Sequence, residues 1–226
     1  MIPIFYQPEN AWAADCIPFF HDGTYYLYYL LDWRDKEGHG EGTPWYLVTT
    51  RDMVHFTEYG EMLARGTADA QDLYVFTGSV VQGLGQFHIF YTGHNHHLSA
   101  LGKPAQGIMH AVSDDLLHWR KLPADTFCAP EPLYERHDWR DPFVFWNDEA
   151  REYWMLLAAR QPGGPSRRLC LPRRERRLCP RAHPRADAGR PRALVGALLR
   201  RLWPDGPRRG SAPRPAHHPP LGHALS

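Results

Sequence analysis

Short apolar segments alternate with polar turns from position 1 to position 160, and this pattern predicts an all-β fold. The apolar segments are rich in Tyr, Phe, Val and Ile, and turn sequences such as His21-Asp22-Gly23 separate them. None of them continues into the 3.6-residue periodicity of a long amphipathic helix. The expected strands are residues 24–31, 44–50, 86–93, 107–113, 141–146 and 152–159.

This pattern repeats along the chain at a constant spacing. The segment TTRDMVHF at 49–56 aligns with VSDDLLHW at 112–119, and the same offset places Asp15, Gly78 and Asp141 at equivalent strand starts. A repeat of this size has room for about four short strands, which is typical of one blade of a β-propeller. The sequence therefore predicts a partial propeller of about two and a half blades.

The composition changes abruptly at Gln161. Residues 1–160 carry 11 Lys and Arg against 22 Asp and Glu, whereas residues 161–226 carry 15 Arg, no Lys, three acids and 12 Pro. Such a segment has little apolar surface to bury, so we expect a disordered tail. We divide the chain into an incomplete catalytic propeller, residues 1–160, and this Arg/Pro-rich tail, residues 161–226.

Two interpretations of the tail differ in their consequences. A genuine basic arm would contact nucleic-acid phosphates, but such arms usually mix Lys with Arg. Here Arg, Pro, Ala, Gly and Leu, the residues with GC-rich codons, make up most of the segment. We therefore favour an out-of-frame reading of a GC-rich gene, and we do not expect a nucleic-acid partner.

The sequence also limits the setting and the cofactors of the protein. It contains no run of 18 apolar residues, and its first ten residues lack the basic and apolar regions of a signal peptide. We expect no membrane partner and, from four cysteines without CxxC spacing, a reducing cytoplasmic location. We expect no cofactor, and no metal at His94, His96 and His97, because no Cys or carboxylate stands beside them in the sequence.

Asp15 and Asp141 are the candidate catalytic residues. The first strand of each propeller blade lines the central channel, so equivalent positions in different blades converge on one pocket. Glycoside hydrolysis requires at least two carboxyl groups that face one pocket. One of them attacks the sugar or activates a water molecule. The repeat therefore favours a carbohydrate substrate.

Four motifs resemble those of glycoside hydrolase family 32, whose members are five-bladed propeller enzymes that act on β-fructosides such as sucrose, inulin and levan. The motifs are WRDP at 139–142, FTGS at 76–79, the strand at 50–56 and the segment AWAAD at 11–15. By this resemblance Asp15 is the nucleophile and Asp141 stabilises the transition state. The substrate-binding residues that it implies are Trp12, Phe76, Ser79 and Arg140.

The chain departs from the family pattern in three places. Ala14 replaces an Asn of the nucleophile motif, and Cys16-Ile17-Pro18 replaces Pro-Asn-Gly, so the exact sugar stays open. The family's acid/base Glu would fall in the tail, where Glu175 has no strand context, and we assign no acid/base residue.

The sequence thus predicts a protein like the retaining β-fructosidases. Two alternatives stay open, namely an inverting arabinosidase or xylosidase like those of family 43, and a propeller that binds carbohydrate without cleaving it. Five blades of this period need roughly 300 residues. We therefore expect the 226-residue chain as written to be an incomplete propeller, poorly soluble and inactive.

Overall fold

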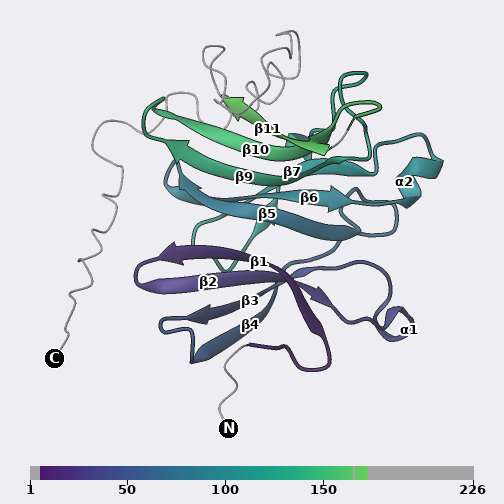
Figure 1. Ribbon diagram of the computed structural model, residues 1–226. Coiled ribbons are helices and arrows are strands. Elements are labelled where there is room, and N and C mark those ends of the chain that lie inside the picture. Colours follow the sequence, from purple (N-terminus) through teal and green to yellow (C-terminus); the bar gives the residue numbers. More distant parts are fainter. Residues whose placement is uncertain (1–5, 165, 173–226) are drawn as a thin grey trace, which may run out of the picture.

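The computed structural model describes residues 6–164 and 166–172, which form three antiparallel sheets stacked one above another (Figure 1). The first sheet runs β1-β2-β3-β4, with β1 Trp12–His21, β2 Thr24–Asp32, β3 Trp45–Thr50 and β4 Phe56–Leu63. The second runs β5-β6-β7-β8, with β5 Tyr74–Gly83, β6 Gln86–His94, β7 Gln106–Ser113 and β8 Arg120–Lys121. The third runs β11-β10-β9, with β9 Trp139–Asn147, β10 Glu152–Arg160 and β11 Ser166–Pro172.

The connections carry three short helical turns, which are α1 Lys36–His39, α2 His97–Ala100 and the 3-10 helix η1 Pro123–Asp125. No helix of the described residues has the length and apolar character needed to cross a membrane. All six strands expected from the apolar pattern are present, and the all-β, propeller-like fold is confirmed. Each sheet is one blade.

The innermost strands β1, β5 and β9 lie next to one another, with β5 in the middle. The first blade carries apolar clusters on both faces, and one of these faces packs against the second blade. In β2, Tyr28 and Leu30 face the second blade, whereas Tyr29 and Leu31 belong to a cluster on the opposite face. This alternation follows from the two-residue period of a strand.

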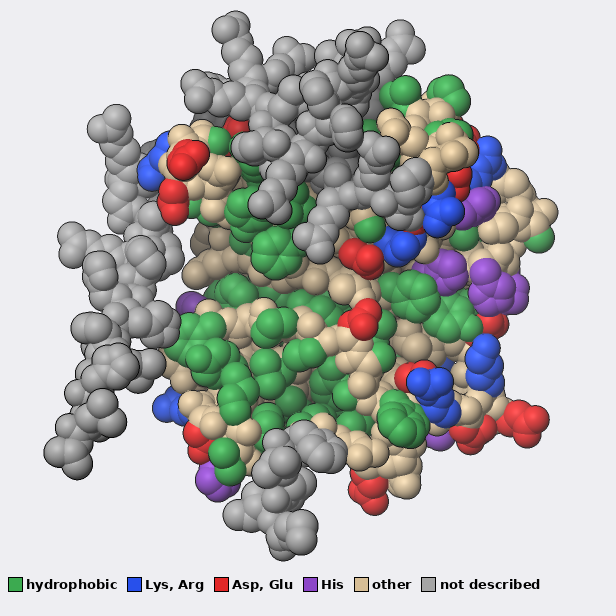
Figure 2. All heavy atoms as spheres, in the orientation of Figure 1, with side chains coloured by type: hydrophobic (Ala, Val, Ile, Leu, Met, Phe, Trp, Pro, Cys, Tyr) green, Lys and Arg blue, Asp and Glu red, His purple; other side chains and the backbone are tan. Residues whose placement is uncertain are grey.

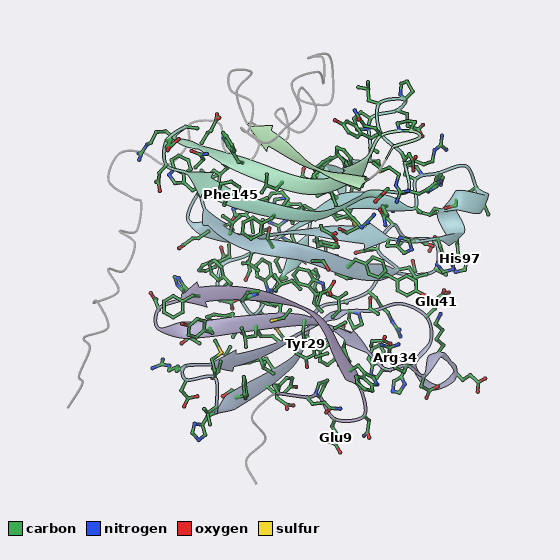
Figure 3. All side chains as sticks on the ribbon, viewed as in Figure 1. Glu9, Tyr29, Arg34, Glu41, His97 and Phe145 are labelled. Carbon is green, nitrogen blue, oxygen red and sulfur yellow. The ribbon has the colours of Figure 1, made fainter. Side chains whose placement is uncertain are left out.

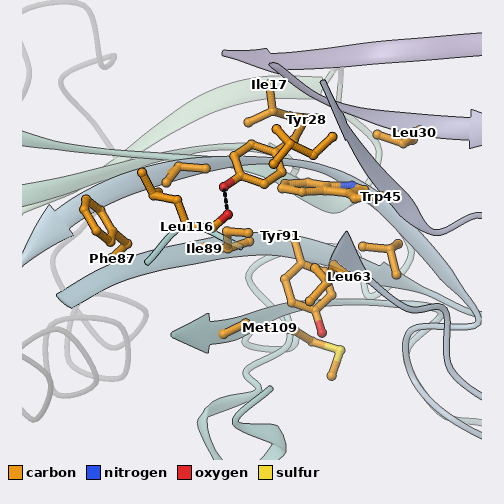
Figure 4. Packing of buried hydrophobic residues seen from close by; sticks show 14 residues of the cluster. Ile17, Tyr28, Leu30, Trp45, Leu63, Phe87, Ile89, Tyr91, Met109 and Leu116 are labelled. Carbon is orange, nitrogen blue, oxygen red and sulfur yellow. Dashed lines mark hydrogen bonds between the residues drawn. The ribbon is translucent and has the colours of Figure 1, made fainter. Parts of the chain in front are cut away.

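The largest cluster lies between the first two blades (Figure 4). Its fully buried side chains include Tyr28, Trp45 and Tyr91. The Tyr28 hydroxyl donates a 2.6 Å hydrogen bond to the carbonyl oxygen of Leu116, which lies in the second blade. A second cluster, centred on Trp139, joins the second and third blades.

Hydrogen bonds confirm the sequence repeat in the turn after the third strand of a blade. Asp52 accepts the backbone N–H of His55 at 2.8 Å and contacts its Nδ1 at 2.7 Å, and Asp115 makes the same two contacts with His118 at the same distances. These exposed histidines therefore occupy equivalent positions of the repeat and make the same turn contacts.

The same period places a β-bulge in each innermost strand. The register shifts between Ala13 and Cys16 in β1 and between Phe76 and Gly78 in β5. In β9 the shift lies between Arg140 and Phe143, opposite the β10 pair Leu156 and Ala158. A bulge interrupts the regular alternation of side chains along a strand. At equivalent positions of β1, β5 and β9, side chains therefore point in directions that a regular strand would not give them.

The expectation of a disordered tail from residue 161 is wrong for Ser166–Pro172. This segment forms β11 and pairs antiparallel with β10, from Arg160 opposite Ser166 to Trp154 opposite Pro172. The free edge of β10 offers unpaired backbone groups, and pairing them requires little of the side chains. The third blade therefore continues past the change in composition. The remainder of the predicted tail, 173–226, lies outside the described residues.

The Tyr28 hydrogen bond between blades yields a stability prediction. Tyr28→Phe leaves the buried Leu116 carbonyl without its donor, so the free energy of unfolding should fall by about 1–3 kcal/mol. Urea denaturation measures the change, with Tyr59→Phe at an exposed position as the control. Equal effects of the two substitutions would show that this contact does not help to hold the blades together.

Candidate active site

Asp15 and Asp141 lie at the bulges of β1 and β9, and a chain of hydrogen bonds connects them through the second blade. The Thr77 hydroxyl donates to Oδ2 of Asp15. The Thr92 hydroxyl donates to the Thr77 carbonyl oxygen at 3.1 Å and accepts the backbone N–H of Asp141 at 2.8 Å. Three blades therefore bring the two predicted carboxylates to one place, as the repeat requires.

Asp15 is close enough to influence the ionisation of Asp141. Burial raises the pKa of Asp141 above its usual range, and the negative charge of Asp15 raises it further, while the charge of Arg140 lowers it. Arg140 Nε lies 3.6 Å from Asp141 Oδ2. Because 44% of the Asp141 side chain stays exposed, a ligand can still reach it.

A buried carboxylate holds Arg140 in place. Asp138 is only 4% exposed and pairs with Arg140 through Oδ1 and with Arg160 Nε through Oδ2, the latter at 2.6 Å. Asp138 was not predicted from the sequence. Its signal was the two-residue spacing to Arg140, which places both side chains on one side of an extended backbone.

The four predicted substrate-binding residues differ in how they reach solvent. Trp12 is 58% exposed at the start of β1, and Arg34 lies 5.9 Å from its ring centroid. Phe76 is half-buried and stacks on His94 with ring centroids 4.8 Å apart. Trp12 therefore offers an accessible aromatic face, whereas Phe76 offers only part of one.

Ser79 does not fit the substrate-binding role that we expected. It is 3% exposed, and its hydroxyl accepts the backbone N–H of Val144 at 2.9 Å. Beyond the bulge, the regular alternation of β5 directs Ser79 toward β9. It joins the second blade to the third.

Thr77 is the residue of the FTGS motif that contacts a catalytic candidate, and it was not predicted from the sequence. Gly78 explains why the second blade supplies a threonine instead of a third carboxylate. A Cβ atom at Gly78 would lie 2.1 Å from the Phe90 carbonyl oxygen, so no side chain fits at this position of the repeat.

The expectation that His94, His96 and His97 lack a carboxylate partner is also wrong. Glu41, from the connection between β2 and β3, contacts His96 Nε2 at 3.3 Å and His97 Nε2 at 2.8 Å. The partner was missed because it comes from the neighbouring blade, far from these histidines in the sequence.

Comparison with known proteins identifies relatives of the chain. Residues 5–169 match the model of the glycosyl hydrolases family 32 N-terminal domain. An extracellular exo-inulinase of Aspergillus niger is 25% identical over 185 residues, which cover 68% of this chain and 33% of that protein. A levanbiose-producing levanase of Bacillus subtilis is 30% identical over 146 residues, which cover 62% of this chain and 27% of the levanase.

Solved structures show the same fold. The exo-inulinase of Aspergillus awamori superimposes with a TM-score of 0.55 at 24% identity and covers 68% of this chain. The sucrose-6-phosphate hydrolase of Lactobacillus gasseri does so with a TM-score of 0.57 at 20% identity and covers 71%. The chain spans about a third of the length of the relatives it matches. From its sequence match, its blades and its paired carboxylates, the chain belongs to glycoside hydrolase family 32 through the family's N-terminal domain.

Proposed function

We propose that residues 6–172 supply the fructosyl-binding part of a retaining β-fructoside hydrolase site. The observation that supports this proposal is the hydrogen-bonded path from Asp15 through Thr77 and Thr92 to Asp141. It holds two accessible carboxylates from different blades beside one arginine. The names of the relatives, which are inulinases and levanases, agree with a fructoside substrate.

In the first half-reaction an oxygen of Asp15 would attack the anomeric carbon, and the bond to the leaving-group oxygen would break. Thr77 engages Oδ2 and leaves Oδ1 free for this attack. The leaving group takes a proton from a general acid, for which we assign no residue of the described chain. In the second half-reaction water gives a proton to the group that acted as the general acid and attacks the same carbon. The bond to Asp15 breaks, which releases fructose and restores the carboxylate.

Asp141 and Arg140 have a different task. Positive charge develops on the sugar ring in the transition state. The attraction between the ring and a neighbouring carboxylate is therefore strongest in that state. Asp141 would also accept hydrogen bonds from hydroxyl groups of the ring. Arg140, held by Asp138, would donate to hydroxyl oxygens and moderate the repulsion between the two carboxylates.

Trapping the covalent intermediate tests the nucleophile. Turnover needs the acid/base residue that we do not assign, so we expect no catalytic hydrolysis by this chain, but the first half-reaction can be tested alone. A 4-nitrophenyl β-fructofuranoside has a leaving group that departs without protonation, so the soluble fraction of the wild-type chain should gain the mass of one fructosyl residue on the peptide that contains Asp15. Asp15→Asn should reduce this adduct by several powers of ten, because the covalent route is lost. Intact-protein and peptide mass spectrometry measure the adduct.

Asp22→Asn is the matched control, since Asp22 is exposed at the turn that ends β1. It should leave the adduct unchanged. Labelling of Asp15→Asn to the wild-type level would contradict the assignment. Release of fructose with inverted configuration and no adduct would instead support the inverting alternative, and sugar binding without either would support a non-catalytic propeller.

A second prediction separates transition-state stabilisation from binding. Asp141→Asn should slow adduct formation at saturating substrate by about a hundredfold or more, while the substrate concentration for half-maximal rate changes little. Stopped-flow release of 4-nitrophenol measures both quantities, with Asp148→Asn as a control in the turn after β9. Weaker binding with an unchanged rate would make Asp141 a simple substrate clamp.

The electrostatic coupling yields a third prediction. Asp15→Asn removes a negative charge and should lower the pKa of Asp141, whereas Arg140→Gln removes a positive charge and should raise it. Carboxyl 13C NMR titration of Asp141 reports both changes with one probe. If neither substitution moves the titration, the two carboxylates do not share a pocket.

A further inference from the structure

Two loops from different blades meet at one edge of the molecule. Glu41 precedes β3 in the first blade, and His96 and His97 follow β6 in the second. Figure 3 shows Glu41 and His97 facing each other there, and Figure 2 shows histidine side chains gathered at the same edge. The two imidazoles engage different oxygens of one carboxylate, since His96 Nε2 lies 3.3 Å from Oε1 and His97 Nε2 lies 2.8 Å from Oε2.

The three ligand atoms lie within 4.8 Å of one another. A tetrahedral zinc ion binds nitrogen and oxygen ligands at about 2.0–2.2 Å, which places neighbouring ligand atoms about 3.3 Å apart. Small side-chain adjustments would therefore bring all three atoms onto one ion. Two histidines and one glutamate with an open fourth position are a known ligand set for zinc.

The surroundings favour a ligand carboxylate over a simple ion pair. The Tyr74 hydroxyl donates a 2.8 Å hydrogen bond to Glu41 Oε1, which is the outer contact that orients a metal-binding carboxylate.

The two imidazole rings lie side by side, with their centroids 4.1 Å apart. Both rings therefore reach the same carboxylate, and one divalent cation placed there could bind a nitrogen atom of each. By contrast, the turn pairs His55 with Asp52 and His118 with Asp115 each bring one histidine to one carboxylate.

We propose that Glu41, His96 and His97 form a zinc-type divalent metal site that joins the first blade to the second, with water as the fourth ligand. The ligands come from two blades, so they assemble only in the folded chain, and metal binding stabilises that state. The site also borders the proposed sugar-binding surface, because the ring of Tyr74 lies 5.7 Å from that of Phe76. The proposal does not depend on the proposed hydrolase activity.

Zinc titration of the 226-residue chain against a chromogenic chelator tests the site, together with thermal unfolding with and without zinc. The double variant Glu41→Gln/His97→Asn should lose one zinc equivalent and the increase in Tm that zinc produces. The double variant His55→Asn/His118→Asn removes two exposed histidines elsewhere and should keep both. His183, His217, His218 and His223 are retained in every variant, so any binding by them is common to all.

Two further substitutions make the result specific. Tyr74→Phe removes only the outer hydrogen bond and should weaken zinc binding about tenfold. His96→Asn removes a single exposed ligand, and it replaces the double variant if near-UV circular dichroism shows that the latter has lost its fold. The proposal is overturned if the ligand variants bind as many zinc equivalents, and gain as much in Tm, as the control variant.

Discussion

The repeated β-bulge is the constraint on which the candidate site depends. It occurs in β1, β5 and β9 at intervals of one blade, and it directs Asp15, Thr77 and Asp141 out of their regular strand positions. A carboxylate in a regular register would point into a packed interface between blades, where burial opposes ionisation. The bulge instead leaves the two aspartates exposed and hydrogen-bonded to the middle blade.

Contacts between blades keep those bulges in register with one another. Besides the apolar clusters, Ser79 accepts from the backbone of Val144, Tyr153 donates to the Gln82 carbonyl, and Gln106 accepts the backbone N–H of Trp139. Each of these hydrogen bonds joins the second blade to the third close to the strands that carry the site. Rigid blades alone would not position Asp141 against Asp15, because the angle between blades also matters.

The sequence predicted the features that follow from the repeat, and it did not predict contacts that depend on packing between blades. The repeat located the strands and paired Asp15 with Asp141. It could not show that Ser79 is enclosed by β9, because burial depends on a neighbouring blade. The contact of Glu41 with His96 and His97 was not predicted for the same reason, since these histidines belong to the next blade. The Arg-rich composition gave no indication of strand β11, because backbone pairing with β10 does not depend on side-chain composition.

The most direct test of this account is a crystal structure of the chain with bound β-D-fructofuranose. The account predicts that one sugar ring contacts both aspartates, with a free oxygen of Asp15 facing the anomeric carbon and Asp141 accepting ring hydroxyl groups. Thr77 should still donate to the other oxygen of Asp15. A fructose ring that contacts neither aspartate, or two aspartates that face separate cavities, would contradict the claim that the repeated bulge builds one site.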